Sequence, residues 1–194
     1  MEELAAFMEL LTMLFTDPHT GTLFALLVLA AVIDYRTYRI PNWLTAAGVV
    51  IGLGYSIGMP LNAPHGFIWS LSGLVTGFAL MLPLYLLRTM GAGDVKLVAM
   101  AGAYLGVHDT LFAAFAAVIV GGIAALGFGL VHRALGRLFA NIKDAAMSVA
   151  WSAMLITRPP LRIDAATSVG RLPFGVSIAI GTIGYVMAKQ FGFV

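Results

Sequence analysis

The chain has 194 residues, of which 60% are hydrophobic and only 10% are charged, and its formal net charge is +2. Soluble domains carry about 25% charged residues, so this chain has too few to cover a surface that faces water. The absence of cysteine excludes disulfides, thiol nucleophiles and thiolate metal centres. We therefore expect an all-α, polytopic membrane protein.

The N-terminal segment places Glu2, Glu3 and Glu9 among apolar residues, where a signal peptide needs a basic region. We expect residues 3–15 to lie in the outer membrane interface. A similar mixture of apolar and charged residues predicts an inner interfacial helix over residues 135–157. Residues 1–194 are expected to form one membrane-embedded domain. Six apolar segments predict transmembrane spans over residues 18–34, 43–59, 67–87, 95–107, 110–131 and 172–188.

The positive charges predict the orientation. Of the eleven lysines and arginines, all but Lys189 fall in the loops after the first, third and fifth segments, or just inside the fourth. Loops that face the cytoplasm carry an excess of basic residues. The loops after the first, third and fifth segments are therefore expected on the cytoplasmic side, with both termini outside.

Two aspartates stand at the cytoplasmic ends of apolar segments. Asp34 ends the first, and Asp94 opens the short fourth segment. A charged carboxylate near hydrocarbon is costly, so such residues usually face a polar cavity and serve a function. The structural alternatives are that Asp34 pairs with Arg36 or Arg39, and that Asp94 caps the fourth helix.

The context of Asp94 favours a function. Gly91 and Gly93 precede it, and glycine allows a tight turn or a close approach to another helix. The fourth segment is too short to cross a core of about 30 Å comfortably. We expect the glycine loop to dip into the membrane and hold Asp94 in a wet cavity, where a β-branched residue at Gly91 or Gly93 would be disfavoured.

Two carboxyl groups at one depth suggest a specific chemistry. If the first and fourth helices pack together, the two groups cannot both ionise easily and share one proton. The ionised group can then activate water while the protonated one polarises a peptide carbonyl, as in an aspartic protease, which needs no metal or cofactor. The alternatives are a small proton-coupled transporter or channel with both aspartates as relay carboxylates, and a structural assembly subunit. The four histidines contain no pair at i,i+4 spacing, so no metal site is expected.

These motifs together resemble those of the type IV prepilin peptidases, which are GxGD-type membrane aspartic proteases. The family pattern is an aspartate followed by a short basic stretch and Ile/Leu-Pro-Asn, and then a second aspartate within Gly-x-Gly-Asp-x-Lys-Leu. In this chain they read Asp34 with Ile40-Pro41-Asn42, and Gly91-Ala-Gly93-Asp94-Val-Lys96-Leu97. The sequence Leu172-Pro-Phe-Gly175 at the start of the last segment is also similar to the family.

The resemblance implies that Asp34 and Asp94 are the catalytic pair, that Gly91 and Gly93 position the second aspartate, and that Lys96, Pro41 and Asn42 support the site. It also implies a substrate, a prepilin or pseudopilin whose short basic leader is removed at the cytoplasmic face of the inner membrane. Expected partners are this substrate, membrane lipid and the pilus assembly machinery, without nucleic acid. Longer members carry a cysteine-containing domain and also N-methylate the product. This chain resembles the short, peptidase-only form of tight-adherence systems.

Overall fold

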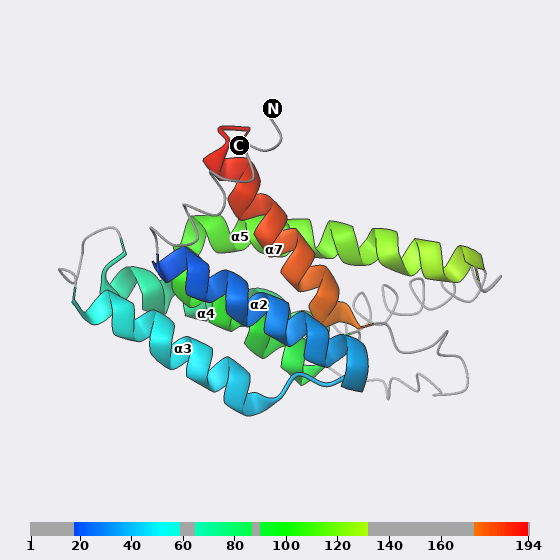
Figure 1. The fold of residues 1–194 in the computed structure, drawn as a ribbon, viewed down its shortest axis with the longest axis horizontal. Coiled ribbons are helices and arrows are strands. Elements are labelled where there is room, and N and C mark those ends of the chain that lie inside the picture. Colours follow the sequence, from blue (N-terminus) through cyan, green and yellow to red (C-terminus); the bar gives the residue numbers. More distant parts are fainter. Residues whose placement is uncertain (1–17, 59–64, 87–89, 132–172, 194) are drawn as a thin grey trace, which may run out of the picture.

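The computed structural model describes residues 18–58, 65–86, 90–131 and 173–193, and this part of the chain is helical without any strand (Figure 1). The all-α prediction is confirmed for these residues. The predicted interfacial segments, residues 3–15 and 135–157, lie outside them. The helices are α2 (Pro18–Thr37), α3 (Asn42–Ile57), α4 (Phe67–Leu86), α5 (Ala92–Val131) and α7 (Phe174–Gln190).

Three of these helices are long and apolar enough to cross a membrane: α2, α4 and the part of α5 from Ala92 to Phe128. Helix α3 is a shorter apolar helix. Large apolar side chains such as Val50, Phe115 and Val131 are two-thirds exposed or more, which suits contact with lipid rather than with water. The chain is thus a multi-pass membrane protein, and the count of six spans stays a prediction.

Helix α5 reverses direction within its length. Gly106 has φ 72° and ψ −178°, which breaks the helix into two arms. A Cβ on Gly93, near the start of the first arm, would lie 3.1 Å from Ile40 Cβ, and one on Gly175 would lie 3.0 Å from Ile40 Cδ1. Gly121, in the second arm, contacts Phe174, the neighbour of Gly175. Both arms therefore return to the same end of the molecule, so the break predicted between residues 107 and 110 corresponds to a reversal at Gly106.

The conformation at Gly106 belongs to a region of φ and ψ that is essentially restricted to glycine. The indole of Trp69 packs against its Cα, where any side chain would have to stand. The hydroxyl of Thr110, in the first turn of the second arm, donates a hydrogen bond of 2.5 Å to the Gly106 carbonyl and so ties this arm to the break. A turn this tight needs no loop between the two arms.

The first arm of α5 is the centre of the bundle. Leu97, Met100 and Ala103 have no exposed surface. Helix α4 approaches this arm backbone to backbone, because Gly73 on α4 faces Gly102 on α5 without an intervening side chain. A close packing of this kind fixes the position of the arm, which begins next to Asp94.

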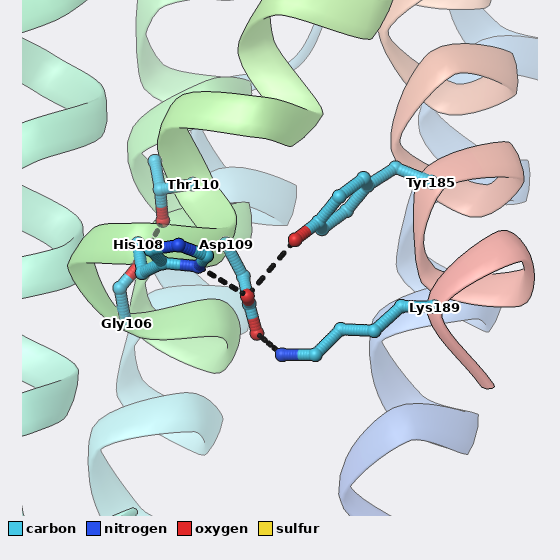
Figure 2. Close-up of polar contacts among 6 residues, drawn as sticks. All are labelled: Gly106, His108, Asp109, Thr110, Tyr185 and Lys189. Atoms are coloured by element: carbon cyan, nitrogen blue, oxygen red, sulfur yellow. Dashed lines mark hydrogen bonds and ion pairs between the residues drawn. The ribbon is translucent and has the colours of Figure 1, made fainter. Parts of the chain in front are cut away.

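Helix α7 crosses the bundle steeply, and its orange N-terminal end lies beside the end of α2 (Figure 1). A Cβ on Gly181 would lie only 2.5 Å from Ala117 Cα, so α7 and the second arm of α5 also touch through their backbones. Beyond the reversal, Asp109 accepts hydrogen bonds from the Tyr185 hydroxyl at 3.0 Å and from Lys189 Nζ at 2.6 Å (Figure 2). These contacts hold the C-terminal end of α7.

Candidate active site

Asp34 lies one turn before the end of α2, which runs three residues beyond the predicted span. Its side chain is buried, with only 5% of its surface exposed. The helix ends when Tyr38 adopts a left-handed conformation, with φ 52°, and donates its N–H to the Asp34 carbonyl. The carboxyl group is therefore held in the protein interior by a helix that continues past it.

The hydrogen-bond partner of Asp34 comes from the last helix. The backbone N–H of Gly175 donates to Asp34 Oδ2 at 2.8 Å. Gly175 lies in the first turn of α7, where backbone N–H groups have no partner within the helix and carry partial positive charge. Among the described residues both ion pairs involve Asp109, so neither Arg36 nor Arg39 pairs with Asp34 as the structural alternative required.

Asp94 lies in the first turn of α5 and is partly buried. The N–H of Gly91 donates to Asp94 Oδ2 at 3.0 Å, and the residue three positions into a helix often accepts such a bond from the capping position. The carboxylate therefore helps to cap the helix from within its first turn, with Gly91 in the capping position that the second structural alternative gave to Asp94. This bond occupies one oxygen and leaves the other available for chemistry.

The glycines before Asp94 do not act through an unusual conformation. Positive φ among the described residues occurs at Tyr38, His65, Gly106 and Gly192 only. Gly93 is already helical, and its missing side chain leaves room for Ile40. Of the two uses of glycine expected here, a tight turn and a close approach to another element, the structure shows the close approach at Gly93.

Ile40 connects the elements that carry the two aspartates. Its side chain is 9% exposed and packs against Gly93 of α5 and Gly175 of α7. Gly93 directly precedes Asp94 and Gly175 binds Asp34, so both carboxyl groups lie around this one side chain. The end of α2, the start of α5 and the start of α7 thus meet at one acidic site.

The other predicted residues lie beside this site. Lys96 Nζ donates to Asn42 Oδ1 at 2.8 Å, which joins the first turn of α3 to the start of α5. Pro41 precedes α3 in an extended conformation, with φ −69° and ψ 137°. Within the described ranges, no group of three or more His, Asp and Glu side chains is arranged to hold a metal ion.

Sequence reasoning missed two contributors, Gly175 and Ile40. Gly175 acts through its backbone N–H, which no residue type reveals, and Ile40 is apolar and reads as ordinary core. Both residues lie in motifs that resemble those of the family, Leu172-Pro-Phe-Gly175 and Ile40-Pro41-Asn42. Their place in these motifs was the signal that could have identified them as part of the site.

The helices and the paired carboxyl groups define a polytopic membrane protein with an acidic site at one end of its bundle. The model of the type IV leader peptidase family matches residues 21–126, which is more than half of the chain. The chain belongs to this family, and its family points to a peptidase. No curated protein and no solved structure matches the chain.

Proposed function

We propose that this protein is an aspartic endopeptidase that removes the short basic leader of type IV prepilins or pseudopilins, with Asp34 and Asp94 as its catalytic pair. Family membership supports cleavage of prepilin-type leaders. The observation that carries the assignment is geometric: Ile40 packs against Gly93, the residue before Asp94, and against Gly175, whose N–H binds Asp34, so the two carboxyl groups from α2 and α5 lie at the same end of the bundle. The alternative function, a proton-coupled transporter or channel, has no comparable support, because the family consists of peptidases.

The proposed chemistry needs one proton shared by the pair. The ionised carboxylate takes a proton from a water molecule, which attacks the scissile carbonyl, while the protonated carboxyl donates a hydrogen bond to the carbonyl oxygen. A buried position for Asp34 excludes bulk water and strengthens these interactions. Each aspartate also accepts a backbone N–H, which fixes its orientation before substrate binds.

The proposed location is the inner membrane with the site facing the cytoplasm. The basic residues beside the site, Arg36, Arg39 and Lys96, support this orientation. In the same orientation the Asp109 cluster of Figure 2 faces outward. The leader of the substrate would be cut on the side where it is synthesised, next to its membrane helix.

The test is co-expression of the chain with a full-length candidate prepilin, scored for leader removal. We expect cleavage by the wild type and none by Asp34→Asn or Asp94→Asn, because neither carboxyl group acts alone. Asp109→Asn is the matched control, since Asp109 is also a hydrogen-bonded carboxylate but lies at the other end of α7. Near-normal processing by either site variant would remove that residue from the pair.

A further inference from the structure

We propose that Gly175 is a positioning residue of the catalytic pair, so that the first turn of α7 completes the active site by holding the Asp34 carboxyl group through a backbone N–H. This inference rests on the proposed function. Gly175 lies beyond the residues 21–126 that match the family, so the inference extends the site into a part of the chain that the match does not cover.

The contact between Gly175 and Asp34 leaves no room for a side chain. The N–H of Gly175 donates to Asp34 Oδ2 at 2.8 Å, and the bond is buried. A Cβ on Gly175 would lie 2.8 Å from the same oxygen, 3.1 Å from Asp34 Cβ and 3.0 Å from Ile40 Cδ1. Real Cβ atoms essentially never approach another atom within 3.0 Å, so any side chain here would push the carboxylate away. Only glycine offers the N–H while leaving the oxygen in place.

The helix that carries the Gly175 N–H is held firmly along its length. Phe174 packs against Gly121, and Gly181 touches the backbone of Ala117, so two turns of α7 rest directly on the second arm of α5. At the far end of α7, Lys189 and Tyr185 bind Asp109 (Figure 2). An N–H carried by a helix that is fixed along its length holds its acceptor in one orientation.

The first turn of α7 also brings partial positive charge to Asp34. The first turn of a helix carries partial positive charge and stabilises a carboxylate, and a hydrogen bond to a charged group is stronger than a neutral one. Asp34 receives this stabilisation from α7, a helix other than its own. The bond therefore sets the orientation of one of the two groups that share the proton, and it stabilises that group whenever it is ionised.

The experiment compares three glycines on α7 by kcat, KM and Tm on the full chain with a prepilin substrate. Gly175→Ala is expected to lower kcat by about 100-fold with KM unchanged, because a misplaced catalytic group slows the chemical step without weakening substrate binding. Gly184→Ala is expected to behave as wild type, since no atom lies within 4 Å of the added Cβ. Gly181→Ala would place its Cβ 2.5 Å from the Ala117 backbone and is expected to lower Tm. This variant serves as the control for a packing defect on the same helix.

A second variant removes the N–H without adding any atom to the side chain. Replacement of Gly175 by glycolic acid in cell-free synthesis exchanges the amide for an ester and leaves the space beside Asp34 free. Loss of a hydrogen bond to a charged group predicts a kcat lower by about 10- to 100-fold at unchanged KM. The same replacement at Gly184 removes an N–H inside the helix, and is expected to lower Tm with kcat unchanged.

The outcomes separate this inference from the proposed function. If the wild type cleaves and Asp34→Asn does not, but both Gly175 variants keep wild-type kcat, the positioning role is refuted and the catalytic pair stands. If Asp34→Asn cleaves normally, the proposed function itself fails. Full recovery of Gly175→Ala by Ile40→Val, which removes the Cδ1 atom, would also overturn the inference, because the contact that matters would then be with Ile40 and not with Asp34.

Discussion

Replacement of Gly93 by valine tests whether spacing at the start of α5 controls catalysis. A Cβ at this position would lie 3.1 Å from Ile40 Cβ, closer than most real Cβ contacts, and 3.6 Å from Ile40 Cγ1, which is ordinary van der Waals contact. The two methyl groups of valine add to this crowding. Ile40 is buried and also packs against Gly175, so it has little room to yield. We expect the start of α5, and Asp94 with it, to move away from Asp34.

The expected effect is large on activity and small on stability. Overpacking of a well-filled site costs about 1–3 kcal/mol, and the better helix propensity of valine over glycine offsets a few tenths of a kcal/mol of this. A displacement of about 1 Å at a reacting group costs about 100-fold in rate. Gly93→Val is therefore expected to lower kcat about 100-fold and to lower Tm by only a few degrees. Both quantities can be measured on one detergent-solubilised preparation.

A control and a compensating change sharpen this test. Gly54→Val in α3 adds the same atoms where no neighbour lies within 4 Å, so its kcat should match the wild type. Ile40→Ala keeps the Cβ atom but removes Cγ1 and the rest of the side chain, which gives the methyl groups of valine more room and should make Gly93→Val less harmful than it is in the wild-type background. If Asp94 served only to cap its helix, Gly93→Val would lower stability and leave cleavage nearly intact. That result would refute the reasoning.

Three further predictions concern the helices around the site. In a membrane preparation of this cysteine-free chain, Arg36→Cys should be labelled only from the cytoplasmic side and His108→Cys only from outside, and the reverse pattern would overturn the orientation. Gly106→Ala should lower the free energy of unfolding by about 2 kcal/mol or more, read as a lower Tm, because alanine is strained at φ 72° and ψ −178°; an unchanged Tm would contradict it. Asn42→Ala should lower kcat by about 10-fold or less, because it releases Lys96 and leaves both carboxyl groups in place; a complete loss of cleavage would show that this contact does more than support the site.

The helices were predictable because a membrane helix is recognised by the apolar composition of its segment. A membrane helix needs about 20 apolar residues in succession, and α2, α3, α4 and α7 start within two residues of the predicted segments. The two aspartates stood out for the same reason, since a charge at the edge of an apolar segment is costly. The reversal in α5 was less predictable. The polar pair His108 and Asp109 suggested a break there, but the chain turns at Gly106, where only the conformation of the backbone marks the site.

The partners of the aspartates could not be predicted residue by residue. A backbone N–H donor such as that of Gly175 depends on where a distant helix begins, and sequence spacing does not give that position. Ile40 matters because it is the common neighbour of Gly93 and Gly175, which is a property of three segments together. Glycine at positions 91 and 93 was expected for a tight turn or a close approach, and only the structure shows that Gly93 approaches Ile40.

The reversal at Gly106 and the acidic site are two consequences of one arrangement. The first arm of α5 is about 20 Å long at 1.5 Å per residue, shorter than a hydrocarbon core of about 30 Å. An arm this short cannot bring both of its ends to the membrane surfaces. Since the arm begins at Ala92, two residues before Asp94, and the reversal is expected at the outer surface, we expect that carboxyl group below the level that a full-length span would reach. The second arm, which runs back from the reversal, then packs against α7 and supports the end of α7 that binds Asp34. A helix that ended in a long loop, rather than in a turn at one glycine, would supply neither the depth of Asp94 nor the support for Gly175.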